Sequence, residues 1–214
     1  MIDLSSPGPL SSPRSAGPSV SFPRARERRA AAMLIRQHAS GDPAEIRNPG
    51  ASTSRPGELF VAAEGDGAVE LFEDGSTPAQ PGDLPATMLF TGGRCGDAGG
   101  DWLFMVGLWT PEDFREEFVA WYKIEHMPIL LECPQWDGCR FVETPAATGR
   151  QFYSLHQMSE RSALDSNERK RSRATPWFRR LSVHPWFDGA FTRTLYRRPV
   201  ARTSFEQIDS QKIP

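Results

Sequence analysis

The sequence of 214 residues lacks an apolar run long enough to cross a membrane, which takes about 20 consecutive apolar residues. The longest run, Trp102–Trp109, has the length of a strand, and the N-terminus lacks the apolar stretch of a secretory signal peptide. Three cysteines, Cys95, Cys133 and Cys139, form neither a disulfide framework nor a zinc pattern. We therefore expect a protein of the reducing cytoplasm with no membrane partner.

Common motifs of catalysis and cofactor binding are also missing. The sequence contains no G-x-S-x-G, no H-E-x-x-H, no P-loop and no G-x-G-x-x-G ahead of a helix. His126 with Cys133 and Cys139 does not have the spacing of a zinc site. The formal net charge of −2 gives no overall attraction to nucleic acid. The sequence predicts no metal, no cofactor and no nucleic-acid partner.

Aromatic residues are concentrated in the second half of the chain. Between Trp102 and Tyr196 lie 17 of the 22, whereas residues 1–101 hold 14 of the 18 glycines and 11 of the 19 prolines. Because large apolar side chains supply most of the buried area, we expect the core in the C-terminal half. The expected segments are a disordered Ser/Pro/Arg-rich tail (1–30), a poorly defined segment (31–100), a folded domain (101–198) and a C-terminal tail (199–214). A transit peptide, or an upstream stretch translated before a start at Met33, would give residues 1–30 a similar composition.

Residues 31–100 contain one distinct local signal. Glu58–Glu64 and Ala68–Phe72 flank Gly65-Asp66-Gly67, which predicts a hairpin whose glycines adopt positive φ. Met33–His38 could be a strand or the start of a helix, and five glycines in residues 92–100 predict a flexible hinge. We find no internal repeat, because this segment is too short for a second copy of the later domain. The N-terminal half is therefore expected to be largely disordered.

The pattern is sharper after residue 101. Strands and helical regions are expected in the order β-α-β-β-α-β, an α+β, ferredoxin-like arrangement with an antiparallel sheet. Their ranges are Trp102–Trp109, Pro111–Met127, Trp136–Glu143, Gln151–Gln157, Ser162–His184 and Gly189–Arg197. Asp165 or Ser166 can start the second helical region, and Thr175-Pro176 restarts it with a fresh cap.

The first of these strands is apolar on both faces. Trp102, Phe104, Val106 and Leu108 alternate with Leu103, Met105 and Trp109. Because helices cover one face of such a sheet, the second face needs another cover. The sheet of an identical subunit would provide it, which predicts a homodimer through the sheet face. The N-terminal half is an alternative cover, but it offers few large side chains.

The first helix is expected to end in the segment Trp121-Tyr122-Lys123-Ile124-Glu125-His126-Met127-Pro128. Tyr122 and His126 lie one turn apart, beside an apolar stripe that ends at Trp121. Pro128 disfavours helical geometry at Met127, so we expect the helix to end there. His126 has two interpretations: a side chain of a pocket, or a helix-end histidine that interacts with the dipole and the terminal carbonyls.

Basic residues are concentrated between residues 161 and 180. They are Arg161, Arg169, Lys170, Arg171, Arg173, Arg179 and Arg180. A polyanion site is one interpretation, but no aromatic platform interleaves with the charges, which favours the solvated face of a helix. A third interpretation is that the acidic segment 57–101 folds back onto this run.

A β-α-β-β-α-β chain with W-Y-x-x-E-H-x-P at the end of its first helix resembles the dimeric α/β-barrel superfamily, specifically its EthD-like and uncharacterised relatives. Thr175-Pro176-Trp177, with Arg179-Arg180 nearby, is similar to the second helix of that subgroup. The resemblance covers residues 101–198, and residues 1–100 have no recognised counterpart. The superfamily includes cofactor-free monooxygenases, lactone isomerases, polyketide cyclases, aldoxime-type lyases and haem enzymes, so the fold does not determine the chemistry.

The resemblance implies that His126 and Tyr122 are catalytic residues that face a cavity between the sheet and the helices. The expected substrate-binding residues are Trp121, Trp109, Phe118, His156 and Trp177. Alternation along the third strand does not decide whether His156 faces this cavity. Glu125 is expected to point outward or to hold the helix end, and His184 to be a helix-end histidine.

Two functions remain open. One is a cofactor-independent isomerase, cyclase or lyase-like enzyme, in which His126 moves a proton of an apolar carbonyl or aromatic substrate and Tyr122 binds the developing enolate oxygen. A cofactor-free monooxygenase is its nearest variant. The other is a non-catalytic module that binds a small apolar molecule in the same pocket. A point within hydrogen-bond reach of both His126 and Tyr122 would favour catalysis, whereas a His126 tied to backbone carbonyls would favour a structural role.

Overall fold

The computed structural model describes residues 32–39, 57–73, 77–145 and 152–199. In chain order the main elements are β1 (Ala32–His38), β2 (Glu58–Ala62), β3 (Ala68–Phe72), β4 (Leu84–Gly93), β5 (Trp102–Leu108), α2 (Glu112–Trp121), α3 (Met127–Leu130), β6 (Gly138–Glu143), β7 (Phe152–Met158), α4 (Asn167–Ser172), α5 (Pro176–Ser182) and β8 (Phe191–Arg197). No helix within these ranges is long and apolar enough to span a membrane. The tails expected at 1–30 and beyond residue 199 lie outside the described residues.

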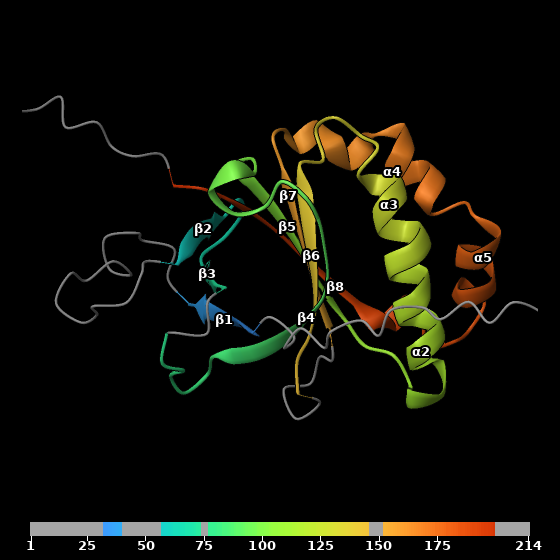
Figure 1. The fold of residues 1–214 in the computed structure, drawn as a ribbon, viewed down its shortest axis with the longest axis horizontal. Helices are drawn as coiled ribbons and strands as arrows, with labels where there is room; N and C mark the ends of the chain where they lie inside the picture. The colour runs from blue at the N-terminus through green and yellow to red at the C-terminus, as the bar shows by residue number, and fades with distance from the viewer. Residues whose placement is uncertain (1–31, 40–56, 74–76, 146–151, 200–214) are drawn as a thin grey trace, which may run out of the picture.

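The second half of the chain forms the ferredoxin-like unit that the sequence predicts. Its strands lie in the order β8-β5-β7-β6, and each neighbouring pair is antiparallel. The helices lie together on one side of these strands (Figure 1). They pack on outward-facing side chains of the sheet such as Val106, Leu108 and Phe141. The expected α+β fold with an antiparallel sheet is confirmed.

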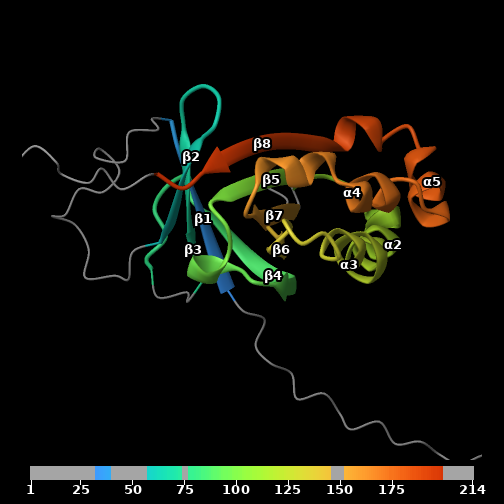
Figure 2. The ribbon, with the colours of Figure 1, turned by 90° about the horizontal axis from the view of Figure 1, so that it is seen from above.

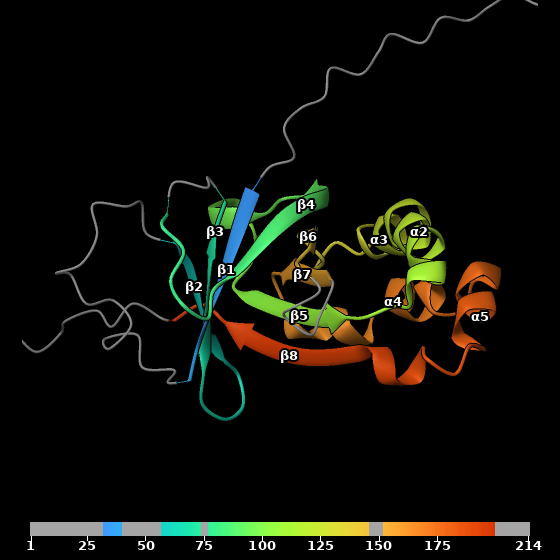
Figure 3. The same cartoon turned by 90° about the horizontal axis from the view of Figure 1, so that it is seen from below.

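The N-terminal half contains far more structure than its composition indicates. Strands β1–β4 form a second antiparallel sheet, and hydrogen bonds join it to the first along two seams, β2 with β8 and β4 with β6. The eight strands close a barrel, with β1–β4 on the side away from the helices (Figures 2 and 3). The predicted hairpin is confirmed, since β2 pairs with β3 and Gly65 and Gly67 have φ of 75° and 123°. The expectation of a largely disordered half therefore fails for residues 57–73 and 77–100.

Both halves of the barrel have the same strand order. The first half runs β4-β1-β3-β2 and the second β8-β5-β7-β6, so each places its fourth, first, third and second strands side by side. Each seam joins the second strand of one half to the fourth strand of the other. A repeat therefore exists in the topology, although the sequence does not reveal one. The second half has α4 and α5 between its third and fourth strands, whereas residues 77–83, between β3 and β4, form no helix. The first half is therefore shorter than the second, and the two sequences do not align.

The barrel interior explains the strand that is apolar on both faces. Leu103 and Met105 of β5 point inward and pack in one cluster with Ile35, Phe60 and Val69 of the first half. The cover is therefore the chain's own N-terminal half and not, as predicted, an identical subunit. Few large side chains suffice because only the inward side chains of these strands need to be apolar. A homodimer through this face would need the space that β1–β4 occupy.

Residues 92–100 form part of the barrel and are not the flexible hinge that their glycines suggest. Gly92 and Gly93 end β4, paired with β6, and a Cβ on Gly93 would lie 2.2 Å from the carbonyl oxygen of Asp137. The backbone N–H of Gly96 donates to Oε1 of Gln157 at 2.7 Å. These glycines allow close backbone approach, and the predicted domain boundary near residue 101 lies inside one hydrogen-bonded barrel.

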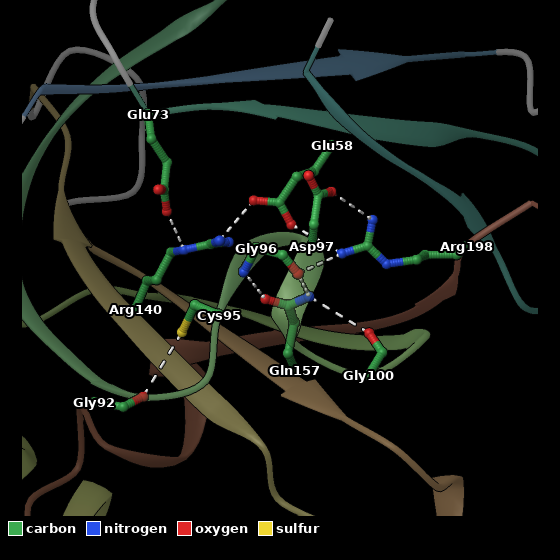
Figure 4. A network of polar contacts seen from close by, with 10 residues as sticks. All are labelled: Glu58, Glu73, Gly92, Cys95, Gly96, Asp97, Gly100, Arg140, Gln157 and Arg198. Atoms are coloured by element: carbon green, nitrogen blue, oxygen red, sulfur yellow. Dashed lines mark hydrogen bonds and ion pairs between the residues drawn. The ribbon is translucent and has the colours of Figure 1, made fainter.

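A buried ionic network ties the two halves together at this end of the barrel (Figure 4). Arg140 of β6 is 1% exposed, and its guanidinium contacts Oε1 of Glu58 at 2.6 Å and the carboxylate of Glu73. Arg198 donates to the other oxygen of Glu58 at 3.2 Å. Burial raises the pKa of Glu58 although Arg140 lies beside it. Removing one partner would leave a buried charge uncompensated, so the network makes the two halves depend on each other.

Substitution of Leu71 by Ala tests whether the halves unfold as one unit. Leu71 lies in β3 and is 1% exposed, whereas all six tryptophans lie in the second half. We expect Leu71→Ala to lower the free energy of unfolding by about 2–5 kcal/mol and to lower the urea midpoint followed by tryptophan fluorescence. Val183→Ala, at a side chain that is 76% exposed, is the control and should leave the midpoint unchanged. An unchanged tryptophan midpoint in Leu71→Ala would mean that the halves unfold independently.

Candidate functional site

A cavity of about 60 Å³ lies between the helices and the outward face of β5, β7 and β8. Its wall is mainly aromatic, with Phe104 from the sheet and Trp121 and Tyr122 from the helical side. Two histidines, His126 and His156, also line it. Three arginines, at positions 169, 173 and 193, complete the lining.

The helical side of the cavity is formed where the helix changes its geometry. Between α2 and α3 a π-helical turn spans Tyr122–His126, and the backbone N–H of Met127 donates to the carbonyl of Tyr122. The prediction that the helix ends at Met127 is wrong, because this residue keeps helical φ and ψ of −64° and −46°. Pro128 falls in the first turn of α3, where its missing N–H leaves no bond unmade, and the π turn shifts the carbonyl that its ring would meet in a continuous α-helix.

The π turn places Tyr122 and His126 side by side. Their ring centroids are 4.8 Å apart, and the ring of Trp121 is 4.7 Å from that of His126. The Nδ1 atom of His126 is buried and has no hydrogen-bond partner among the described residues. A buried polar atom without a partner is costly, so this nitrogen is a candidate contact for a ligand.

Glu125 holds the end of this turn. Its Oε1 accepts hydrogen bonds from the indole N–H of Trp121 at 3.1 Å and from the hydroxyl of Thr175 at 2.6 Å. Thr175 also caps α5, since its side chain accepts from the backbone N–H of Phe178 at 3.1 Å. The carboxylate thus fixes the orientation of Trp121 and joins the π turn to α5, which is one of the two roles expected from the sequence.

A chain of hydrogen bonds runs from the cavity floor to Tyr122. Nε1 of Trp136 donates to Nδ1 of His156 at 3.1 Å, and because an indole can only donate, the neutral imidazole carries its proton on Nε2. That nitrogen lies 2.7 Å from Oγ of Ser154 and donates to it. The hydroxyl of Ser154 in turn hydrogen-bonds Tyr122. The Tyr122 hydroxyl is therefore held in place, with its own proton available to a ligand.

Burial keeps these polar groups neutral. It lowers the pKa of His126 to about 3, while a backbone hydrogen bond with Ser172 acts in the opposite direction and the nearby arginines add to the decrease. Burial also holds the pKa of His156 well below its usual range. The pKa of Tyr122 is raised by burial despite its bond to Ser154. At neutral pH the cavity contains two neutral imidazoles and a neutral phenol.

Four of the seven residues predicted for the site line the cavity: Trp121, Tyr122, His126 and His156. The other three do not. Trp109 is 40% exposed, Phe118 is buried behind Trp121 and Tyr122, and Trp177 donates to Glu117 at 3.1 Å. Phe118 is fully buried and packs against Phe152 of the sheet, so it serves the core.

Sequence reasoning missed five residues of the site that carry polar groups: Trp136, Ser154, Arg169, Arg173 and Arg193. It also did not name the other lining residues as part of the site: Phe104, Val106, Leu130, Phe178, Phe187 and Phe191. Alternation along β7 put Ser154 on the face of His156, and this face is now seen to be the one under the helices. The basic run divides in the structure. Arg171 and Arg180 pair with glutamates at the surface, as a solvated face would, and two other members turn toward the cavity.

Metal ligands do not gather in the described part of the chain. There, no three His, Cys, Asp or Glu side chains are arranged to hold a metal ion. Cys133 and Cys139 are buried free thiols, and burial raises the pKa of Cys139.

Several solved structures share the architecture. A major regulator of staphylococcal pathogenesis matches with a TM-score of 0.53 at 12% identity, over 79% of this chain and 99% of its own. A ferredoxin-fold protein of Listeria monocytogenes related to antibiotic biosynthesis monooxygenases gives 0.52 at 10%, over 80% and 96%. An anthrone oxidase-like protein gives 0.53 at 12%, over 81% and 93%. No protein-family model and no curated protein sequence matches the chain.

These matches include the N-terminal strands, because residues 101–198 alone are less than half of the chain. At 10–12% identity the matches show the fold and not the chemistry. The chain therefore shares the ferredoxin-like fold of these proteins.

Proposed function

We propose that the protein is a cofactor-independent enzyme that moves a proton on a small apolar carbonyl or aromatic substrate, as an isomerase, cyclase or lyase does. The observation that carries this proposal is the buried, unpartnered Nδ1 of His126 in the same cavity as the hydrogen-bonded phenol of Tyr122. A neutral imidazole nitrogen accepts a proton, and a phenol donates a hydrogen bond to a carbonyl oxygen. The two residues that carry the groups required for enolisation line one small cavity.

The reaction needs no co-reactant. His126 takes a proton from the carbon next to the carbonyl, the C–H electron pair forms the enolate double bond, and the carbonyl π pair moves onto oxygen. Tyr122 donates a hydrogen bond to that oxygen and stabilises its charge. Return of the proton from His126 to a different carbon completes an isomerisation.

His156 acts as a positioning residue in this mechanism. Its Nδ1 accepts from Trp136 and its Nε2 donates to Ser154, so neither nitrogen is available to take a substrate proton. Its contribution is to orient Ser154, and through Ser154 the phenol of Tyr122. Buried donors held in this way need little reorganisation when charge develops on the substrate.

The low pKa of His126 bears on its strength as a base. A value of about 3 describes the cavity without a ligand, where burial and two arginines disfavour the imidazolium. An enolate formed within about 4–6 Å would favour the charged imidazole and raise its pKa by about 1–3 units. The proton transfer is therefore coupled to formation of the enolate, and substrates with an already acidic C–H are favoured.

A non-catalytic binding module is the second candidate, and two observations favour it. His126 has a backbone hydrogen bond with Ser172, which is the mark of a structural histidine. The cavity of about 60 Å³ is also smaller than most enzyme pockets, which measure roughly 300–1,000 Å³. In this case the same aromatic wall would hold a small apolar molecule without turnover.

We propose that the protein belongs to the dimeric α/β-barrel superfamily as an EthD-like relative. The W-Y-x-x-E-H-x-P segment at Trp121–Pro128 supports this proposal. The anthrone oxidase-like match supports a second variant of the chemistry, the cofactor-free monooxygenase. In that variant the enolate reacts with O₂ from solution before it is reprotonated. Both variants begin with the same proton abstraction, so one set of substrates tests both.

Replacement of His126 by Gln separates catalysis from structure. Glutamine keeps a hydrogen-bond donor but cannot take a proton near neutral pH. We expect His126→Gln to slow exchange of the acidic C–H of one-ring ketones and phenols with D₂O, followed by NMR, by about 10²–10⁴-fold with an unchanged melting temperature. An oxygen electrode on the same substrates distinguishes the monooxygenase variant.

His184→Gln is the matched control, because His184 packs against Phe114, with ring centroids 4.3 Å apart, and does not line the cavity. It should keep full exchange activity. Full activity of His126→Gln would remove His126 from the chemistry and leave the binding module.

The pKa of His126 also predicts how stability varies with pH. Its folded-state value of about 3 lies below the ordinary 6.5, so between these two values the unfolded chain binds more protons. The free energy of unfolding should therefore fall as the pH falls through this range. His126→Gln removes the contribution, so its melting temperature should fall less steeply on acidification than that of the unsubstituted protein. Parallel melting curves would show that His126 is not held neutral by burial.

A further inference from the structure

The mouth of the cavity is surrounded by guanidinium groups from two elements. Arg169 lies on α4 and Arg173 directly after it, while Arg193 comes from β8 on the other side. Arg169 is half-buried, with its guanidinium 5.9 Å from the centre of the Phe104 ring, and the guanidinium of Arg193 is 5.0 Å from the centre of the Phe191 ring. Stacking on aromatic faces holds two of the three cations against the lining.

These cations have no counter-ion within the described part of the chain. No carboxylate there lies within 4.0 Å of the guanidinium of Arg169, Arg173 or Arg193, although most other described arginines of the second half have one. Burial lowers the pKa of Arg169 and of Arg193, and repulsion from Arg173 adds to the decrease in both. The cavity lining contains no Asp or Glu. The site thus carries like charges that repel one another, and Asp165, which forms no ion pair with Arg169, opposes this repulsion only from a distance.

Helix stabilisation explains only part of this arrangement. Arg169 lies in the last turn of α4, where a cation is favourable, and it donates to the carbonyl of Leu164 at 2.5 Å. Arg193 lies on a strand and has no such role. Its side chain nevertheless affects the same group as Arg173 does, since both arginines lower the pKa of Tyr122. The two basic elements therefore converge on the phenol at the centre of the site.

We propose that the cavity selects a small anionic aromatic ligand, of the aromatic carboxylate class, with its anionic group held between Arg173 and Arg193 at the mouth. This inference rests on the function proposed above and names the class of its substrate. Guanidinium groups match a carboxylate in geometry and charge, and the aromatic wall accepts the edge of a ring. Tyr122 and His126, which line the same cavity, remain for the reacting part of the molecule.

The size of the cavity limits the ligand to one ring. Its volume of about 60 Å³ is below the roughly 150 Å³ of a cavity that binds benzene. Arg173 and Arg193 are exposed, so their long side chains can move outward as a ring enters. A larger polycyclic acid would need the helices themselves to move.

Benzoate and benzamide form a matched pair of probes, because they share shape and differ in charge. We expect benzoate to bind the full chain about tenfold more tightly than benzamide in calorimetric titration, and more weakly as salt is added. Arg193→Gln and Arg173→Gln should each remove most of this preference, whereas Arg193→Lys should retain part of it. Arg179→Gln is the control, since Arg179 is exposed on α5 and does not line the cavity.

Equal binding of both probes, no binding of benzoate, or an equal loss in Arg179→Gln would overturn the proposal. Sulfate that competes as well as benzoate at matched ionic strength would also overturn it, because the site would then take any anion. Benzoate binding and C–H exchange, both measured on His126→Gln, distinguish loss of the anion site from failure of the proposed function. A protein that binds benzoate with its charge preference intact but catalyses no exchange retains the anion site and loses the enzyme. A protein that exchanges neutral ketones without preference for benzoate does the reverse.

Discussion

The pairing of β4 with β6 and of β2 with β8 is the interaction on which the rest of the structure depends. These two seams convert two four-stranded sheets into a closed barrel, whose interior holds apolar side chains of both. Closure removes the sheet edges and gives Leu103 and Met105 their cover. The ionic network of Arg140 with Glu58 joins β6 to β2 at one end, so charge as well as hydrogen bonding links the halves. Because of this closure the outer face of β5–β8 is left for the helices and the cavity.

Alternation along β7 then separates the side chains of the barrel core from those of the site. On β7 the side chains of Tyr153 and Leu155 enter the barrel, while Ser154 and His156 face the helices. A shift of one residue in the pairing would exchange the two sets and place His156 in the apolar interior. On the helical side the π turn places Tyr122 and His126 next to each other in the cavity lining. Tyr122, His126 and His156 are therefore positioned by helical and strand backbone, whereas Trp136 and Arg173 lie in connecting segments.

Much of the second half could be predicted because its signals are local. Alternation gave the faces of β5, and Thr175-Pro176 gave the start of α5 with its cap. Apart from its hairpin the N-terminal half could not, because its strands are poor in aromatics, and β2 and β4 pair with strands of the second half that are distant in the sequence. The glycines of residues 92–100 looked like a hinge for a related reason. Their need for glycine arises from close backbone contact, as at Gly93, which a sequence does not show.

The candidate site was predicted in part, and the division follows the same logic. Tyr122 and His126 lie one turn apart in the sequence, so helical geometry brought them together. The arginines of the mouth come from α4 and β8, and only the fold brings Arg193 near Arg173. Trp136 is tied to His156 across twenty residues by a hydrogen bond that no spacing rule anticipates. Such partners depend on tertiary structure, and the sequence offered only their charge or their aromatic character.

Native-state hydrogen exchange of the full chain tests the central claim, that the N-terminal half completes the barrel in place of a second subunit. The amides of β4 and β6 share one ladder, so the account predicts that they exchange with similar protection and through the same opening as the amides of β5. Protection should not depend on protein concentration, because no second copy is needed to cover β5. Rapid exchange throughout β1–β4 while β5–β8 remain protected, or protection that grows with concentration, would contradict the account.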